Sequence, residues 1–119
     1  MTVGKYNLVF FDMIDPTGAE KVGGYALMNG EVVGSTCTTG VVIRPIGTPY
    51  PPTITTALPT ALTLNMTLND GSVLSGVLNQ TTTQINLGLY VRWIGTFEGT
   101  IDGAIQKGSA LWDQFAVSL

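Results

Sequence analysis

The sequence predicts an all-β fold: a single up-and-down antiparallel β-barrel of about eight strands that spans residues 1–119. Apolar and polar residues alternate over several segments, tight-turn sequences separate these segments, and no segment begins as a helix would. A barrel is favoured because closure removes the open edges that so apolar a sheet would expose. A two-sheet β-sandwich is the alternative architecture.

Two hairpins are predicted in the first part of the chain. The turn Asp15-Pro16-Thr17-Gly18 combines a proline that presets φ with a glycine that accepts positive φ. Asn29-Gly30 is typical of a type I′ turn, which needs positive φ at both positions. Gly23-Gly24 indicates a bulge or sharp bend within the second strand. The expected strands cover residues 4–14, 20–28, 31–35 and 41–43.

A proline-rich segment, residues 45–59, should leave the sheet, because proline cannot donate a ladder hydrogen bond. We expect an ordered loop that crosses one end of the barrel. After it, residues 62–68 alternate cleanly, and Asn69-Asp70-Gly71 predicts another hairpin to a strand over 72–79. The tract 80–84 is expected to be a polar connection.

The segment 85–105 is predicted to contain two consecutive strands that meet near Gly95, each with one apolar face. The first face consists of Ile85, Leu87, Leu89, Val91 and Trp93, and the second of Phe97, Ile101 and Ile105. Glycines at positions 88, 95, 99 and 103 are expected to mark bends or room for a ligand. A last strand is expected within 109–119.

Composition restricts the function. Charged residues make up 11% of the chain, well below the usual value of about 25%, so we expect part of the surface to be covered by other copies, as a homo-oligomer, or by a partner. The net charge of -3 and the scattered basic residues argue against nucleic acid and anionic membranes. No apolar run could span a bilayer, and no signal peptide is apparent, so we expect a chain that is either leaderless and cytoplasmic or already processed.

Metal and thiol chemistry are not expected, nor is a cofactor. The chain has no histidine, which removes the commonest metal ligand and the commonest general base. Its single cysteine, Cys37, cannot form an internal disulfide and has no nearby base, so we interpret it as an inert thiol.

Large side chains on the strands could line an apolar pocket within such a barrel. The candidate substrate-binding residues are Phe10, Met66, Trp93, Phe97, Trp112 and Phe115. Among polar groups, Asp12 or Glu98 would have a raised pKa and could act as an acid if it pointed into an apolar cavity. The hydroxyls of Tyr25 and Tyr90 could each donate a hydrogen bond to a bound carbonyl. The candidate catalytic residues are therefore Tyr25, Tyr90 and Glu98.

Three segments, 15–23, 67–71 and 95–103, resemble the hairpins and glycine-punctuated strands of the allene oxide cyclase-like barrels, which include spirotetronate-type polyketide cyclases. The likeness lies in turn spacing and glycine pattern, over about half of the chain. It implies a cofactor-independent cyclisation in which a pocket folds a flexible apolar substrate, mainly through orientation. No catalytic residue of that family can be assigned to a position here.

The leading functional hypothesis is a barrel that binds a hydrophobic small molecule, with a possible role as a cyclase of natural-product biosynthesis. Two alternatives remain open. Low charge also suits a self-assembling virion or filament subunit. A sugar-binding module would use exposed Trp112 and Tyr50 as stacking residues. For a pocket, we expect Trp93→Ala to abolish ligand binding without changing assembly.

Overall fold

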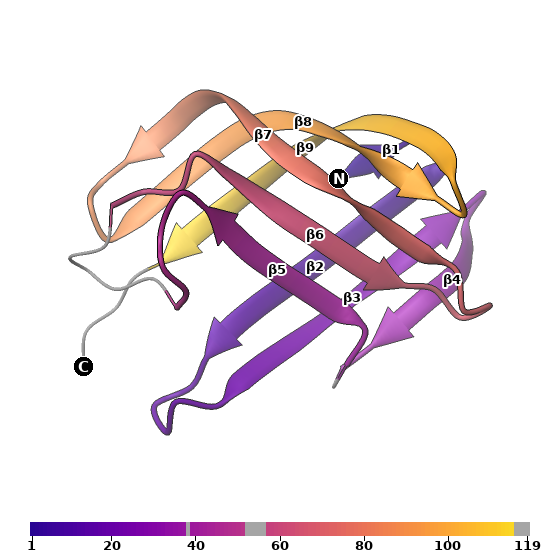
Figure 1. Cartoon of the computed structure of the whole chain (residues 1–119), viewed down its shortest axis with the longest axis horizontal. Helices are drawn as coiled ribbons and strands as arrows, with labels where there is room; N and C mark the ends of the chain where they lie inside the picture. The colour runs from indigo at the N-terminus through magenta and orange to yellow at the C-terminus, as the bar shows by residue number, and fades with distance from the viewer. Residues whose placement is uncertain (38, 52–56, 116–119) are drawn as a thin grey trace.

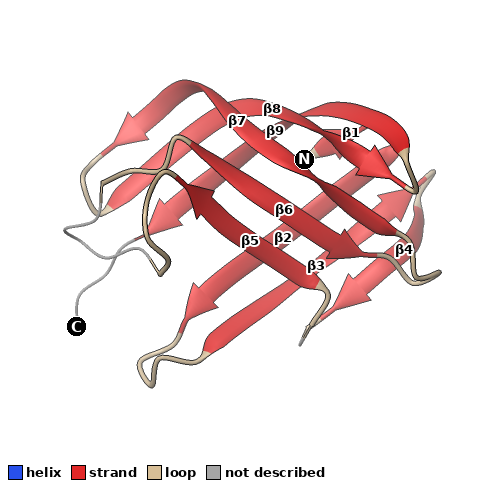
Figure 2. Ribbon diagram, viewed as in Figure 1, coloured by secondary structure: helices blue, strands red, loops and turns tan. Residues whose placement is uncertain are grey.

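A computed structural model describes residues 1–37, 39–51 and 57–115, and it confirms the all-β prediction. Within these residues every regular element is a strand (Figure 2). The strands are β1 (Thr2–Val3), β2 (Tyr6–Ile14), β3 (Glu20–Met28), β4 (Glu31–Thr36), β5 (Val41–Ile46), β6 (Ala61–Thr67), β7 (Val73–Asn86), β8 (Tyr90–Ile101) and β9 (Ala104–Phe115).

All nine strands belong to one antiparallel sheet with the order β4-β3-β2-β1-β9-β8-β7-β6-β5. This is the cyclic order of an up-and-down barrel, with the hydrogen-bonded ladder interrupted between β4 and β5. The sheet curls so that β5, whose hydrogen-bonded neighbour is β6, also approaches β2 and β3 near the other edge of the sheet (Figure 1). We call this approach of β5 to β2 and β3 the seam.

The predicted turns are confirmed. Asp15 accepts hydrogen bonds from the backbone of Thr17 and Ala19, and Gly18 has a φ of 86°. Asn29 and Gly30 both have positive φ, at 53° and 81°, as a type I′ turn requires. At the third hairpin Asp70 accepts from Ser72. Each of these turns can thus be traced to residue types that tolerate or stabilise its backbone.

The expected bulge at Gly23-Gly24 is wrong. Both glycines pair in regular register with β2, and the irregularity of β3 falls between Ala26 and Leu27, where it pairs with β4. The tract 80–84 also differs from its prediction, because it lies within β7 and pairs with β8 through two register shifts. Bulges let this polar tract remain hydrogen-bonded in the sheet.

The boundaries within 85–105 also differ from the prediction. The chain turns at 87–89, so Leu87 and Leu89 are exposed rather than part of an apolar face. A second turn, Asp102-Gly103, reverses the chain between β8 and β9. It places Ile105 opposite Thr100 on the outer face, where Ile105 is 76% exposed. The strand β8 runs through Gly95 without a break.

Aromatic rings of the core fill the space above the strand glycines. The ring of Phe97 lies over Gly76 and Gly99, which pair with each other, so a Cβ at either glycine would come within 2.6 or 2.7 Å of Phe97 Cζ. Trp112 lies over Gly95 in the same way, at 2.6 Å from a Cβ placed there. At positions 95 and 99, therefore, the room that was expected for a ligand is occupied by side chains.

Two further expectations extend beyond the described residues. The proline-rich segment leaves the sheet later than expected, because Pro45 and Ile46 pair with β6 in β5, an edge strand, where a proline is tolerated. Residues 52–56 lie outside the described part. The last strand begins earlier than expected, at Ala104, and residues 116–119 are likewise not described. In the ranges 1–37, 39–51 and 57–115 there is no helix that could cross a membrane.

Candidate functional site

The predicted site residues divide between the two faces of the sheet. Four of the aromatic and sulfur-containing candidates are buried in the core, and Phe10 is half-buried against it. The four are Met66, Trp93, Phe97 and Trp112. Because only 6% of Trp112 is exposed, it cannot provide the exposed stacking surface that a sugar-binding module would need.

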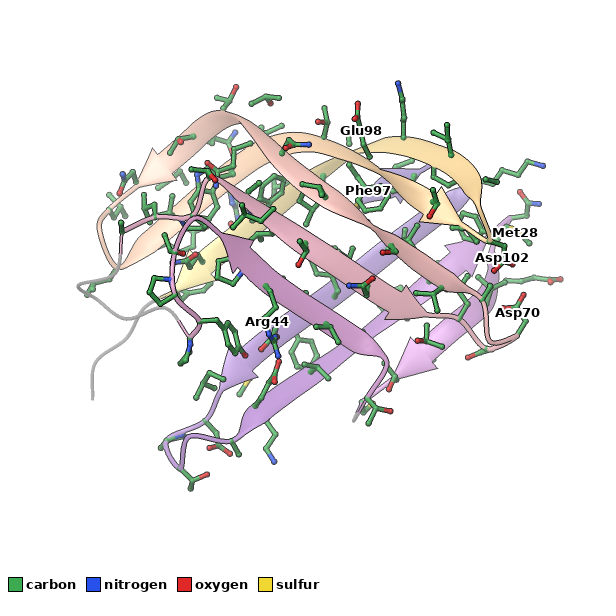
Figure 3. The ribbon with its side chains drawn as sticks, viewed as in Figure 1. Met28, Arg44, Asp70, Phe97, Glu98 and Asp102 are labelled. Carbon is green, nitrogen blue, oxygen red and sulfur yellow. The ribbon has the colours of Figure 1, made fainter. Side chains whose placement is uncertain are left out.

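The other candidates lie on the outer side. Tyr25 is 44% and Phe115 64% exposed, and Glu98 points away from the sheet, on the opposite side from Phe97 (Figure 3). The hydroxyl of Tyr90 donates to Asp113, which also pairs with Arg92 at 2.8 Å. The structure therefore does not bring Tyr25, Glu98 and Tyr90 together with the aromatic core.

A different set of polar residues meets at the seam. Arg44 extends from β5 toward β2 and β3 (Figure 3), where its guanidinium donates to both oxygens of Glu20, at 2.8 and 3.0 Å. The same group donates to Asp12 Oδ2 at 3.2 Å. Tyr50, just beyond β5, donates its hydroxyl to Asp12 Oδ1 at 3.0 Å. We call Asp12, Glu20, Arg44 and Tyr50 the seam cluster.

Local structure explains why these groups converge. Asp12 is in phase with Leu8 and Phe10 on the inner face of β2, close to the point where that strand ends. Glu20 opens β3 opposite Ile14, so both carboxylates lie at the same end of the β2–β3 hairpin. Arg44 lies on the edge strand β5, from which a long side chain can reach around to the seam. Its guanidinium also stacks on the Tyr50 ring, with 4.0 Å from Cζ to the ring centroid.

The two carboxylates of the seam cluster have opposite pKa shifts. Burial, followed by hydrogen bonding with Glu20, raises the pKa of Asp12 to about 6. Hydrogen bonds from Arg44, followed by the hydrogen bond with Asp12, lower the pKa of Glu20 to about 2. Burial and the bond to Asp12 raise the pKa of Tyr50, which stays a neutral donor. Such a split assigns the exchangeable proton to Asp12 and the negative charge to Glu20.

An open pocket of about 250 Å³ adjoins the seam cluster. It is lined by Glu20 and Val22 of β3, by Arg44 and by residues 39–42. A second open pocket, of about 290 Å³, lies against Met1, Ile94 and Leu111. Neither pocket is lined by Met66, Trp93 or Phe97, which pack against the core instead.

Sequence reasoning identified only part of this cluster. It expected Asp12 or Glu98 to become an acid if the side chain pointed into an apolar cavity. Asp12 is on the inner face with 9% of its side chain exposed, but its neighbours are the polar groups of Arg44 and Tyr50, and Glu98 points outward. Arg44 and Glu20 were not singled out. The available signal was the even spacing of Leu8, Phe10 and Asp12, which places a carboxylate in phase with core residues.

The outer face of β2, β3 and β4 carries large apolar side chains. They are Val9, Phe11, Met13, Tyr25 and Val32, each at least 44% exposed. Exposed apolar side chains on neighbouring strands fit the expectation, drawn from the low charge content, that other molecules cover part of the surface. A homo-oligomer stays a prediction.

The pH dependence of stability should reveal the split between the two carboxylates. Asp12 binds its proton more tightly in the folded protein, so lowering the pH from 7 to about 5 should raise the free energy of unfolding. Glu20 has the opposite effect. Its contribution to the free energy of unfolding is present above pH 4.5 and is lost as the pH falls toward 2. Urea unfolding at pH 7, 6, 5, 4 and 3 should therefore show the greatest stability between about pH 4 and 5.

The matched control for this measurement is Asp12→Asn, whose side chain does not titrate. The free energy of unfolding of this variant should no longer increase as the pH falls from 7 to 5, whereas it should still decrease below pH 4.5. Equal urea midpoints of the unsubstituted protein at pH 7 and 5 would contradict the assignment of the raised pKa to Asp12.

Comparison with known proteins gives one informative similarity. The chain is 36% identical over 117 residues to the quinolone epoxide rearrangement protein penF of Penicillium thymicola. The aligned region is 95% of this chain and 32% of the relative, so the chain spans about a third of that protein's length. No family model and no solved structure matches the chain, so the resemblance to allene oxide cyclase-like barrels stays a prediction.

Proposed function

We propose that this chain promotes the acid-assisted rearrangement of an epoxide carried by an apolar, aromatic small molecule. The observation that carries the proposal is the Asp12 carboxyl, which is 9% exposed, has a pKa raised to about 6, and is hydrogen-bonded to Arg44, a residue that lines an open pocket together with Glu20. A carboxyl of this kind can hold a proton near neutral pH and give it to a reacting oxygen. The similarity to a quinolone epoxide rearrangement protein supports the choice of an epoxide.

The reaction balances as an isomerisation. Asp12 donates its proton to the epoxide oxygen, one carbon–oxygen bond breaks, and the electron pair of that bond stays on oxygen. A group on the carbon that still bears the oxygen then migrates, with its bonding electrons, to the adjacent cationic carbon. The carbon it leaves becomes a protonated carbonyl, which returns its proton to the Asp12 carboxylate. One group thus acts as acid and then as base.

The other members of the seam cluster position this acid. Tyr50 fixes one carboxyl oxygen of Asp12 through its 3.0 Å hydrogen bond. Arg44 keeps Glu20 ionised through two hydrogen bonds, so that Glu20 disfavours a second negative charge on Asp12. The anionic Glu20 also lines the pocket, where it can stabilise a cation that develops on the substrate.

The proposal keeps the predicted hydrophobic ligand and the cyclase-like class of chemistry. It differs from the sequence hypothesis in its polar groups, since Asp12 and Tyr50 replace Tyr25, Glu98 and Tyr90. The aromatic candidates near the same end of the sheet, Phe10 and Trp112, remain proposed substrate contacts.

Turnover of an epoxide-bearing 2-quinolone tests the proposal. We expect the protein to convert it into an isomer of unchanged mass, detected by liquid chromatography with mass spectrometry. Carbon-13 NMR should show that the two epoxide carbons are replaced by one carbonyl carbon and one migrated centre. A product heavier by one water would indicate hydrolysis, and a rate equal to that in buffer would indicate no catalysis; either result would overturn the proposal.

A further inference from the structure

Trp112 has a hydrogen-bond donor that nothing in the described structure satisfies. Its indole Nε1 is fully buried and has no partner among residues 1–37, 39–51 and 57–115. An indole N–H can only donate, so it requires an acceptor. Because buried donors in folded proteins are nearly always paired, this one calls for an explanation, such as a bound group.

The strand register places Trp112 toward the same end of the sheet as Asp12. Thr2 of β1 pairs with Asn7 on one side and with Ser109 on the other, and β2 and β9 run in the same direction. Three residues further along each strand, Phe10 is level with Trp112. Asp12 is the next inward-facing position beyond Phe10. At Thr2, where β1 lies between them, β2 and β9 are two interstrand spacings apart, roughly 10 Å.

A second unpaired group lies toward the same end of the sheet. The hydroxyl of Thr48 is also buried without a partner in the described residues. Thr48 follows the end of β5, which runs in the same direction as β9, and it precedes Tyr50 by two residues. This end of the sheet thus combines an acid, two unpaired hydrogen-bonding groups and two aromatic rings, Phe10 and Trp112.

We propose that Trp112 Nε1 binds the carbonyl oxygen of the ligand, so that the substrate is a flat aromatic molecule with an amide-type carbonyl. This inference rests on the proposed function for the epoxide at Asp12, and it adds the group by which the substrate is oriented. In this arrangement a fused two-ring system would place its carbonyl at Trp112 and a substituent toward Asp12. Trp93, 6.2 Å from Trp112 between ring centroids, supports the indole from the neighbouring strand.

An NMR titration with two unreactive probes tests this assignment. The probes are 2-quinolone, which has a carbonyl acceptor, and naphthalene, which has the same two-ring shape and no acceptor. The chain has two tryptophans and hence two indole N–H signals, which Trp112→Phe assigns. We expect 2-quinolone to move the Trp112 signal downfield in the proton dimension, and naphthalene to leave it without that downfield shift.

Affinities of the same probes complete the test. Trp112→Phe should weaken 2-quinolone binding about fivefold to tenfold, the size of one hydrogen bond, and change naphthalene binding less than twofold. Equal weakening of both probes, or no effect of 2-quinolone on the Trp112 signal of the unsubstituted protein, would overturn the inference. A shifted Trp112 signal in a protein that fails to rearrange the epoxide would reject the proposed function and leave this binding site in place.

Discussion

Asp12→Asn should slow the rearrangement of an epoxide-bearing 2-quinolone by about 10²- to 10⁴-fold, the range that a positioned general acid contributes. Asparagine keeps the shape of aspartate and can still accept the Tyr50 hydrogen bond, but it has no acidic proton to give. Binding of the unreactive 2-quinolone should stay within a few-fold. The measurement is kcat under saturating substrate, together with the probe titration.

Asp102→Asn is the matched control. The same substitution is made at an exposed carboxylate in the turn between β8 and β9, where φ is 49° and asparagine is well tolerated. Its kcat should equal that of the unsubstituted protein. The rate of the unsubstituted protein should also fall as the pH rises above about 6, and this dependence should vanish in Asp12→Asn. An Asp12→Asn protein with undiminished kcat would refute the role of Asp12.

Phe97→Ala should lower the free energy of unfolding by about 3–5 kcal/mol, the usual loss for a buried phenylalanine. The Phe97 side chain is fully buried, and its ring lies over Gly76 and Gly99. Because glycines have no side chain, neither can move into the space that the ring leaves, so the cavity should persist. Urea unfolding followed by far-ultraviolet circular dichroism measures the change.

Phe115→Ala controls for the substitution itself. Phe115 is 64% exposed and contacts Tyr90 at 4.7 Å between ring centroids, so its loss should cost less than about 1 kcal/mol. If Phe97→Ala and Phe115→Ala were equally stable, Phe97 would not be a principal core residue. The prediction for Trp93→Ala changes for the same reason, since Trp93 is 1% exposed and its truncation should disturb folding as well as binding.

Local signals predicted the hairpins well. Asp15 to Gly18 and Asn29-Gly30 form turns whose requirements are met by the residues themselves, so no distant contact is needed to specify them. The turn Asp102-Gly103 carries the same type of signal and could have been recognised. Because this turn was not predicted, Ile105 was expected on the apolar face, whereas it lies on the outer face. Conversely, Gly23-Gly24 and the tract 80–84 stay in regular or bulged strands because neighbouring strands supply their hydrogen bonds.

The seam cluster was largely beyond reach of the sequence. Periodicity places Asp12 on the inner face, but it cannot show that the opposite edge strand returns to cover it. Arg44 has no pattern that distinguishes it from a surface arginine until β5 is placed against β2 and β3. The pKa shift of Asp12 depends on that placement, so it follows from the tertiary structure alone.

The seam has a consequence for the kinetics of folding. Its polar contacts join residues that are 24, 32 and 38 positions apart, whereas the hairpins pair neighbours in the chain. Contacts of long sequence separation carry a larger loop-closure cost and generally form later. The hairpins should therefore assemble before β5 reaches β2 and β3. During refolding, the strand structure of the hairpins should recover first, and the acid at Asp12 should acquire its shifted pKa only afterwards, when β5 reaches β2 and β3.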